Sequence, residues 1–356
     1  MKKMVMFGYN MEMGGAERAL INVINAVKNE FEIDLILIKA EGSLMKDIPG
    51  EVNIRVIRKN LLQYVLFRYV SFFRKKTIRR MTKKSYDVAI AFMEGRAATW
   101  LVDMKQTCKK IGWIHNDVNL FDIGISKQEI LSTYSKLDEI VVVSEHSKKS
   151  FCEKYHIPSE KVKVIYNLID EETILNKADE FVPEKNTFTF VNVAKMRPQK
   201  RHDRLLEAVS ILKKEGYSFK VWSIGDGPLQ ENNRQLAKEL DVLDKVEFLG
   251  LQENPFPYVK TADWFVMSSD HEGYPLSLLE SLLLKTPVIT TKVSGADEIL
   301  QGGKYGDICD VSVDGLVNSM RKVLVGKEDK AVWENLLTYK GSNKEIIEQL
   351  KKSFNS

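Results

Sequence analysis

The chain has 356 residues, of which 44% are hydrophobic and 29% are charged, and its formal net charge is +4. This length suits two domains of ~150–200 residues each, and the composition excludes a disordered or fibrous chain. Three scattered cysteines (Cys108, Cys152, Cys309) form no CxxC pair, which argues against a disulfide scaffold or a zinc site. No apolar run approaches the ~20 residues that cross a bilayer, and the first run is too short for a signal peptide, so we expect a cytoplasmic protein.

The first half of the chain alternates short apolar runs with helical patterns. The runs are mostly apolar throughout, as in parallel strands that are buried on both faces, and they predict a doubly wound sheet. The predicted strands are 3–7, 33–38, 54–57, 88–92, 110–114, 139–143 and 162–165, and helices are predicted at 16–28 and 147–155.

The first predicted strand leads into MGGAER at residues 13–18. Gly14 and Gly15 allow backbone amides to approach a ligand closely at a helix start, although a plain tight turn has the same sequence. The segment lacks the GxGxxG dinucleotide fingerprint, which disfavours a dehydrogenase.

Basic residues dominate the segment from Arg58 to Lys84, which contains ten Lys or Arg and no acid. Seven apolar residues fall on one face of a predicted helix within it: Leu61, Leu62, Val65, Leu66, Tyr69, Phe72 and Phe73. An apolar face beside dense charge indicates peripheral contact of residues 61–84 with an anionic membrane, at ~1 kcal/mol per cation. The alternative is a helix packed on its own domain with a solvated basic end. No recognised nucleic-acid motif accompanies the charge, so nucleic acid is not expected.

Polar residues end two later strands of this half. His115 and Asp117 follow the strand at 110–114, and Ser144 follows the strand at 139–143. A histidine at a strand end is often structural, but the carboxyl ends of parallel strands are also where ligands bind in open α/β sheets. His115 is therefore a candidate site residue.

The second half repeats the alternation after a polar, acidic segment at 171–186 that we predict to be a linker. Together the two halves predict an α/β fold with two Rossmann-like, doubly wound parallel sheets that face each other across a cleft. The predicted strands are 187–193, 219–224, 245–249, 264–267 and 287–290, and the predicted helices are 202–215, 228–240 and 276–285. The predicted domains are 1–170 and 187–340, and residues 341–356 form a C-terminal helix that packs back toward the first domain.

Two segments of the second half suggest a phosphate site. Residues 193–202, VAKMRPQKRH, carry four Lys or Arg in seven positions, and a departing diphosphate needs such cations. Residues 268–280, SSDHEGYPLSLLE, follow a buried strand, and Pro275 is well placed at the first position of a helix. The free amides at that helix start suit a phosphate or sugar oxygen, and Glu272 and Glu280 can both reach a ligand there. The alternative for residues 193–202 is a solvated basic loop. The alternative for the second segment is that Glu272 caps the helix and Glu280 is solvated.

The segment Glu272–Glu280 resembles the Glu-x7-Glu motif of family-4 glycosyltransferases with the GT-B fold, and residues 281–299 resemble its continuation. The resemblance implies that Glu280 binds the ribose of a donor. It also implies that Glu272, with the backbone from Gly273 through Tyr274 and Pro275 to Leu276, faces the transferred sugar and the diphosphate.

Three further segments fit the same family. Its Gly-Arg-Leu-x-x-x-Lys-Gly pattern places the diphosphate on Lys195 and Lys200, with Ala194 and Arg201 in place of the two glycines. The Gly-x-Gly-Pro turn that lines the nucleotide is matched around Asp226. The resemblance also implies that Gly14 and Gly15 approach the donor and that His115 faces the sugar, so His115 and Glu272 are the predicted catalytic residues.

The family resemblance implies a retaining glycosyltransferase of bacterial surface-polysaccharide type, with the first domain binding the acceptor and the second the donor. It is expected to move a hexose or N-acetylhexosamine from a UDP-sugar to a lipid-linked or polysaccharide acceptor, at the inner face of the cell membrane. No Asp-x-Asp motif is present, which favours transfer without a metal, and no cofactor is expected. The alternatives are an epimerase-like enzyme of the same fold and a catalytically silent nucleotide-sugar-binding protein.

Overall fold

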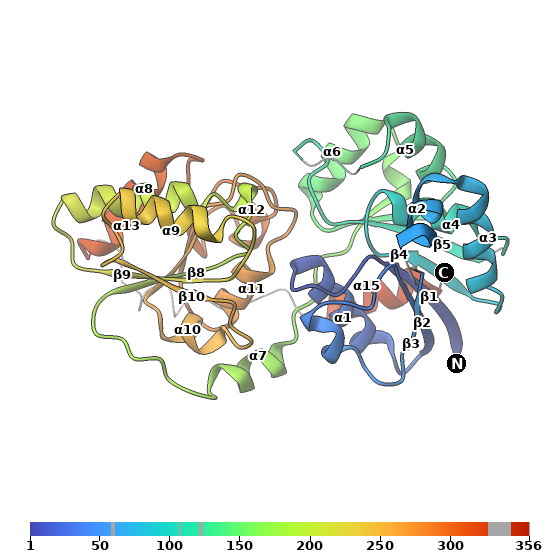
Figure 1. Ribbon diagram of the computed structural model, residues 1–356, viewed down its shortest axis with the longest axis horizontal. Helices are drawn as coiled ribbons and strands as arrows, with labels where there is room; N and C mark the ends of the chain where they lie inside the picture. Colours follow the sequence, from blue (N-terminus) through green and yellow to red (C-terminus); the bar gives the residue numbers. More distant parts are fainter. Residues whose placement is uncertain (58–60, 107, 121–123, 327–342, 356) are drawn as a thin grey trace. The chain divides into compact units, whose positions relative to one another are not determined.

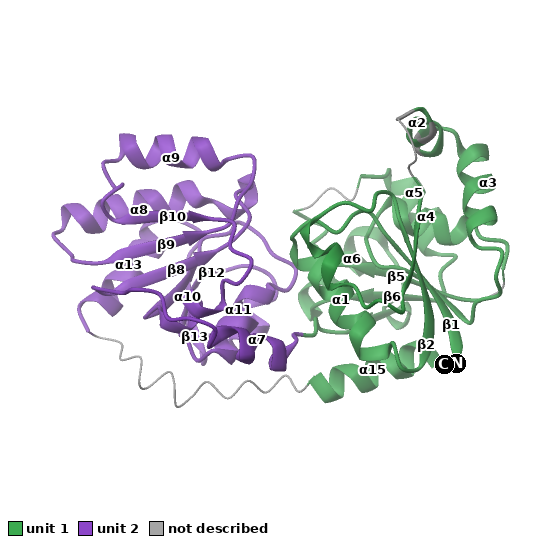
Figure 2. Cartoon of the chain, turned by 60° about the horizontal axis from the view of Figure 1, so that its bottom comes forward, with its two compact units in different colours: residues 1–168, 342–356 green, residues 169–341 purple. Residues whose placement is uncertain are grey.

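The computed structural model describes residues 1–57, 61–106, 108–120, 124–326 and 343–355. The chain divides into two compact units, the first formed by Met1–Leu168 with Ser342–Ser356 and the second by Ile169–Gly341 (Figure 2). The end of the first unit thus lies close to the domain boundary predicted at residue 170.

Unit 1 is built on a parallel seven-stranded sheet with the strand order β3-β2-β1-β4-β5-β6-β7. Its strands are β1 (Lys2–Gly8), β2 (Phe31–Leu37), β3 (Asn53–Val56), β4 (Val88–Ala91), β5 (Lys109–Ile114), β6 (Glu139–Val142) and β7 (Val162–Val164). Its helices are α1 (Gly15–Val27), α2 (Leu61–Tyr69), α3 (Ser71–Met81), α4 (Arg96–Asp103), α5 (Lys127–Tyr134), α6 (Glu145–Tyr155) and α15 (Asn343–Asn355) (Figure 1).

Unit 2 is built on a parallel six-stranded sheet with the order β10-β9-β8-β11-β12-β13. Its strands are β8 (Thr189–Val193), β9 (Lys220–Ile224), β10 (Val246–Gly250), β11 (Trp264–Met267), β12 (Val288–Thr291) and β13 (Gly306–Cys309). Its helices are α7 (Glu171–Ala178), α8 (His202–Lys214), α9 (Gln230–Glu239), α10 (Phe256–Thr261), α11 (Leu276–Leu283), α12 (Ala296–Ile299) and α13 (Val313–Leu324).

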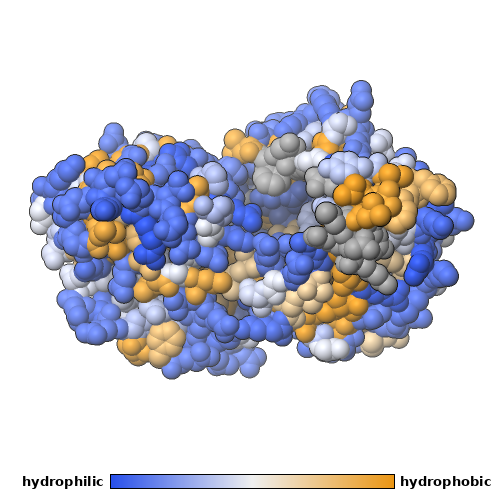
Figure 3. All heavy atoms as spheres, in the orientation of Figure 1, coloured by the Kyte–Doolittle hydropathy of each residue, from blue (hydrophilic) through white to orange (hydrophobic). Residues whose placement is uncertain are grey.

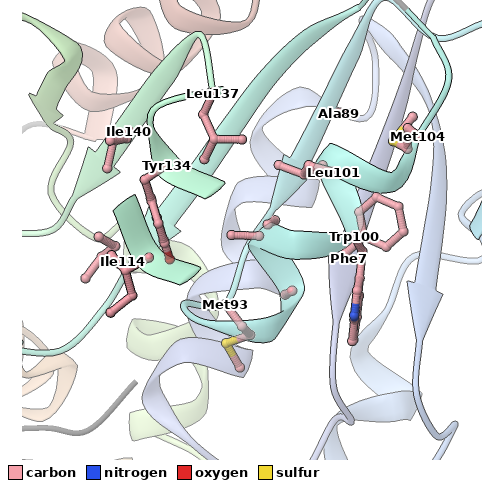
Figure 4. Close-up of a cluster of buried hydrophobic side chains, with 14 of the residues drawn as sticks. Phe7, Ala89, Met93, Trp100, Leu101, Met104, Ile114, Tyr134, Leu137 and Ile140 are labelled. Atoms are coloured by element: carbon pink, nitrogen blue, oxygen red, sulfur yellow. The ribbon is translucent and has the colours of Figure 1, made fainter. Parts of the chain in front are cut away.

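The two parallel sheets confirm the predicted α/β architecture. Central strands such as β4 and β11 are buried at every residue, which is why their sequences are apolar runs rather than alternating patterns. Each sheet also has a core of its own. In unit 1, Trp100 and Leu101 of α4 meet Phe7 and Ala89 of the central strands (Figure 4).

Part of the predicted linker is a helix that belongs to unit 2. The side chain of Asp170 caps α7 by accepting a hydrogen bond from the amide of Thr173, at 3.1 Å. Ile174 and Ala178 of α7 are buried, and the helix contacts α10 and α11. The polar and acidic composition of this segment reflects its exposed face, while the buried face is too narrow to be evident from the sequence.

The basic segment also differs from the single amphipathic helix that its sequence predicts. The helix breaks at Val70, which has an extended backbone (φ −107°, ψ 101°) and caps α3. The apolar residues therefore divide: Phe73 packs against the core, whereas Phe72 is 75% exposed. Within the basic segment, Arg58 and Lys59 lie outside the described residues, as do the side chains of Leu61 and Arg68. Residues 327–340, which belong to the predicted second domain, also lie outside them.

Helix α15 packs on unit 1. The ring of Phe354 makes edge contacts with the rings of Phe31 and Trp113, at centroid distances of 6.2 and 6.5 Å. The side chain of Lys351 forms an ion pair with Glu30 at 2.5 Å. The C-terminal helix thus completes the core of the unit that contains the N-terminus (Figure 2).

Candidate functional site

The strand order of unit 2 reverses between β8 and β11. In open α/β sheets ligands bind outside the carboxyl ends of the strands at such a reversal, because the chain leaves the two neighbouring strands toward opposite faces there. The loop at residues 194–201 follows β8, and the loop at 268–275 follows β11. The two segments in which the sequence predicts a phosphate site therefore both begin at the reversal.

Lys200 and Glu272 meet at this point. The Lys200 ammonium contacts Oε1 of Glu272 at 2.5 Å, and the Ser269 hydroxyl donates a hydrogen bond to the same oxygen at 2.6 Å. The side chains are 21% and 12% exposed, so the ion pair is largely shielded from water. A partly desolvated cation and carboxylate interact more strongly than the same pair in water, so this contact links the two loops.

Backbone contacts hold the loops together. The Ser268 hydroxyl donates to the carbonyl of Lys200 at 2.9 Å, and the amide of Asp270 donates to the carbonyl of Gln199 at 2.8 Å. Strand β12 joins through its last residue, Thr291, whose hydroxyl donates to the carbonyl of Ser269 at 2.6 Å. The loop that carries Glu272 is thus held by the segment after β8 and by the end of β12.

Two glycines let the loop after β9 approach the loop after β8. Gly225 has φ +136°, and a Cβ atom there would lie 2.1 Å from the carbonyl oxygen of Ala194. Gly227 has φ +150°, and its Cβ would lie 2.6 Å from the carbonyl of Met196. Asp226, between them, accepts a 2.6 Å hydrogen bond from the Met196 amide through its carbonyl. The close approach places Asp226 beside the basic loop that contains Lys195.

Helix α11 starts at Leu276, where the predicted helix 276–285 begins, but Pro275 is not the first helical residue as expected. Pro275 has an extended backbone (ψ 112°) and is the N-cap, so Leu276 is the first helical residue. The loop before the helix is packed tightly, since a Cβ on Gly295 would lie 2.4 Å from the carbonyl of Gly273. Tyr274 is half-buried in this loop, and Glu280 is half-buried and lies in the second turn of α11.

Arg201 adopts the left-handed conformation, with φ +48°. Its guanidinium pairs with Asp203 at 2.9 Å and with Asp270 at 3.2 Å. The neighbouring Arg204, which the sequence did not single out, is only 5% exposed at its side chain and contacts Asp270 at 2.6 Å and the carbonyl of Ser268 at 2.7 Å. These two arginines are engaged in holding the loop, in contrast to Arg197, which is exposed.

The predicted site residues of unit 1 lie at the carboxyl ends of its own strands. Gly14 is the N-cap of α1, and Gly15 is the first residue of that helix, with no atom within 4 Å of an added Cβ. Neither glycine has a positive φ. A Cβ on Gly14 would lie 2.3 Å from Oε2 of Glu17, so Gly14 makes room for that side chain, whereas Gly15 leaves open space at the start of α1.

His115 is buried, with 7% of its surface exposed. Its Nε2 lies 2.8 Å from the carbonyl of Phe92, which can only accept, so Nε2 carries the proton and Nδ1 has a lone pair. Nδ1 is buried and makes no hydrogen bond to any residue in the described part of the chain. Burial lowers the pKa of His115, because desolvation disfavours the charged imidazolium. His115 is therefore a neutral hydrogen-bond acceptor. Its backbone N–H donates a hydrogen bond to the carboxylate of Glu94 at 3.1 Å, which helps to position it.

Two neighbouring candidates have structural partners. Asp117 is 2% exposed and contacts Nε2 of His146 at 2.9 Å, a residue that the sequence did not single out. Ser144 is fully buried, and its hydroxyl caps α6 by accepting from the amide of Ser147 at 3.0 Å. Ser144 is thus the N-cap residue of α6.

Within the described ranges, no group of three or more His, Cys, Asp or Glu side chains is arranged to hold a metal ion. Over the same ranges, no helix is long and apolar enough to span a bilayer.

Comparisons with known proteins agree with this architecture. Residues 13–173 match the family described as Glycosyltransferase Family 4, and residues 174–335 match Glycosyl transferases group 1. The two matches meet near the boundary between units 1 and 2, so each family description corresponds to one unit.

Similar proteins include the N-acetylgalactosamine-N,N'-diacetylbacillosaminyl-diphospho-undecaprenol 4-alpha-N-acetylgalactosaminyltransferase of Campylobacter jejuni, 28% identical over 327 residues, or 87% of each chain. The O-antigen biosynthesis glycosyltransferase WbnH of Escherichia coli is 26% identical over 294 residues, which cover 82% of this chain and 81% of WbnH. Among solved structures, Anabaena HepE in complex with UDP and glucose matches over the full length of both chains, with 17% identity and a TM-score of 0.79. The chain therefore belongs to the family-4 glycosyltransferases and has their GT-B fold.

Proposed function

We propose that the protein transfers a hexose or N-acetylhexosamine from a UDP-sugar to a lipid-linked or polysaccharide acceptor, with retention of anomeric configuration. The similar Campylobacter enzyme is named for a diphospho-undecaprenol-linked acceptor, and the E. coli relative for O-antigen biosynthesis. HepE was solved with UDP and glucose bound. These names support a nucleotide-sugar donor and an acceptor carried on a lipid or a growing glycan.

The observation that carries the proposal is the contact between Lys200 and Glu272 at the strand-order reversal of unit 2. A leaving diphosphate develops negative charge, and a fixed ammonium beside free helix amides stabilises that charge without reorganisation. In the proposed complex, Lys200 and Lys195 bind the diphosphate and Glu280 binds the ribose. Glu272 then accepts a hydrogen bond from a hydroxyl of the transferred sugar.

His115 supplies a different function in unit 1. Its neutral Nδ1 is an acceptor for a hydroxyl of the transferred sugar, which would hold the reacting carbon in place. We assign the proton of the acceptor to the leaving phosphate, so no protein base is needed. The cations of the loop after β8 neutralise the diphosphate, and the reaction requires no metal ion.

A panel of nucleotide-sugars tests the donor site. UDP-sugars should raise the thermal unfolding midpoint by mass action, and GDP- and dTDP-sugars should raise it less. Glu280→Gln should weaken the UDP effect, whereas the exposed Glu207→Gln on α8 is the matched control and should leave it intact. If no nucleotide-sugar stabilises the chain, the donor assignment is wrong.

Product analysis separates the proposed reaction from its alternatives. An α-linked product from an α-linked donor, at a rate that EDTA leaves unchanged, is expected for retention without a metal. Donor turnover that needs no acceptor would favour an epimerase-like enzyme. UDP binding without transfer to any lipid-linked or glycan acceptor would favour a silent binding protein.

We also propose that unit 1 contacts an anionic membrane through α2 and α3. Several apolar side chains on these helices are exposed, and Lys75, Lys76, Arg80 and Lys83 are exposed beside them. Apolar surface together with cations is what binding to an anionic interface requires. By contrast, Arg74 forms a 2.6 Å ion pair with the buried Asp103, so it stabilises the fold instead.

Co-sedimentation with vesicles of phosphatidylglycerol tests this contact. Replacing the four exposed cations named above with Gln should reduce vesicle binding by at least tenfold, at ~1 kcal/mol for each cation. A matched control replaces the exposed residues Lys127, Lys136, Lys149 and Lys214, and it should bind like the wild type. Equal losses in both variants would show that only total charge matters and would contradict the assignment to α3.

A further inference from the structure

A pocket of about 420 Å³ lies within unit 1. It is lined by residues that follow β1 and β2 and by residues of α2, α3 and α4. Its volume falls in the ~300–1,000 Å³ range of small-molecule sites, and it adjoins the carboxyl end of β1, where the strand order of this sheet reverses. Neither the donor-site residues of unit 2 nor His115 line it.

Aromatic rings form one side of the pocket. Trp100 makes edge contacts with Tyr9 and Phe67, at centroid distances of 5.7 and 5.4 Å. The Tyr9 hydroxyl is already engaged, because it donates to the carbonyl of Glu94 and accepts from the amide of Ala97. This wall therefore presents ring surfaces in fixed positions, which suit apolar groups or the face of a sugar.

Three cations also line the pocket, and they differ in how far they are neutralised. Arg74 is paired with the buried Asp103 at 2.6 Å, and Lys39 is paired with Glu41 at 3.0 Å on the surface. The half-buried Arg96 has no ion-pair or side-chain hydrogen-bond partner among the residues that the structure describes. A half-buried guanidinium without a counter-charge is costly, and a bound anion removes that cost.

The helices that line the pocket also present apolar side chains to solvent. Leu62 and Tyr69 are each 69% exposed, and Phe72 is 75% exposed. Figure 3 shows hydrophobic surface at the place where Figure 1 has α2. A pocket with a half-buried cation suits a charged head group, and the exposed apolar side chains beside it suit a lipid chain. The two features together fit an amphiphile.

We propose that this pocket binds the phosphate-bearing head of a lipid-linked acceptor, with Arg96 as the phosphate ligand. The rings of Phe67 and Trp100 contact the group next to the phosphate, and the exposed apolar residues of α2 and α3 border the lipid chain. This assignment rests on the proposed transfer to a lipid-linked acceptor and specifies where unit 1 recognises it.

Calorimetric titration of the full chain with geranyl diphosphate tests the proposal, because this probe has a diphosphate and a short isoprenoid chain. Arg96→Gln should weaken binding by tenfold or more, the effect of losing a charge-assisted hydrogen bond, while Arg96→Lys should retain part of the affinity. Lys136→Gln removes an exposed cation of unit 1 that does not line the pocket, and it should bind like the wild type.

Inorganic pyrophosphate and vesicles separate the possible sources of the anion. Pyrophosphate should bind at least tenfold more weakly than geranyl diphosphate; equal affinities would show that the lipid is not recognised and would overturn the proposal. Equal losses for Arg96→Gln and Lys136→Gln would also overturn it, since they indicate general charge attraction. Vesicle binding should be unchanged in Arg96→Gln.

Stabilisation by UDP is measured on the same variants. It should be unchanged in Arg96→Gln, because the donor residues lie in unit 2. A wild type that UDP stabilises but that does not bind geranyl diphosphate would refute the pocket assignment alone. If UDP does not stabilise the wild type, the proposed donor is refuted instead, whatever the outcome with geranyl diphosphate.

Discussion

Arg201 occupies a backbone conformation that the family pattern assigns to glycine. A side chain at φ +48° costs ~1–2 kcal/mol relative to the right-handed region. Ion pairs with Asp203 and Asp270 offset that cost and fix the loop that carries Lys200. The departure from the family sequence is therefore accommodated locally by a residue that is not a free diphosphate ligand.

Glu272 offers a direct test of the sugar-side assignment. Glu272→Gln keeps the shape of the side chain and removes its charge, so transfer should fall by ~10²-fold or more while UDP affinity changes little. Steady-state transfer rates and UDP titrations measure the two effects, with the exposed Glu207→Gln as the control. If UDP affinity falls as far as the rate, Glu272 contacts the nucleotide rather than the sugar.

His202 predicts a pH dependence of stability. Burial lowers its pKa to about 4, and neither ring nitrogen has a hydrogen-bond partner among the residues that the structure describes. An unfolded histidine takes up a proton near pH 6.5 while the folded one resists it, so stability should be constant above pH 6.5 and fall as the pH drops toward 4. The loss should be on the order of 3 kcal/mol.

The variant His202→Leu removes both the titration and the unpaired nitrogens. Denaturant unfolding at pH 7.5, 5.5 and 4.5 should show a flatter dependence than the wild type. His156→Asn, at an exposed left-handed position that Asn tolerates, should keep the wild-type slope. Parallel slopes for the wild type and His202→Leu would contradict the prediction.

At the scale of elements, short loops between rigid strands decide the geometry of the candidate site. The contacts of Lys200 with Glu272, and of Gly225 with the carbonyl of Ala194, join segments that are far apart in the sequence. Each loop is placed by the strand before it, and parallel register brings the strand ends to one edge. The donor loops are thus organised by the sheet rather than by local propensity.

Gly225→Ala tests this loop packing. A methyl group would lie 2.1 Å from the Ala194 carbonyl at φ +136°, so the loop must shift. Gly216 has φ +88° with nothing within 4 Å, so Gly216→Ala measures the conformational cost alone, about 1 kcal/mol. Denaturant unfolding should show a larger loss for Gly225→Ala, together with weaker UDP binding; equal losses would mean that the close approach is unimportant.

At the scale of the whole molecule, the chain returns to its first unit at the end. The ring of Phe354 is 3% exposed, and the Ser353 hydroxyl donates to the carboxylate of Glu139. The last helix therefore contributes core surface to a domain whose sheet was completed almost 180 residues earlier. Unit 1 is not complete without it.

Phe354→Ala should destabilise unit 1 by ~3–5 kcal/mol, as expected for the loss of a buried phenyl ring. Lys352→Ala, at an exposed position two residues earlier, is the control and should have little effect. Thermal unfolding followed by near-UV circular dichroism detects the change around Trp113. Equal behaviour of the two variants would show that α15 adds no core stability.

The sequence by itself determined the two parallel sheets, because strands buried on both faces must be apolar along their whole length. The predicted strands agree with the structure to within one or two residues, whereas β13 and the helices α4, α5, α10, α12 and α13 were not predicted. β13 is only four residues long and contains Gly306 and Asp307, so it lacks the apolar run that reveals a strand. Within the site, the sequence singled out Lys200 and Glu272 through their motifs.

Tertiary structure alone decided which of these residues touch. The 2.5 Å contact of Lys200 with Glu272 spans 72 positions, and the buried Arg204 acts on a loop that follows another strand. The break at Val70 is likewise not evident in the local pattern, which fits one continuous helix, and after the break α3 packs against α4. Local patterns encode burial and periodicity, whereas contacts between strand ends depend on strand order, which only the folded sheet establishes.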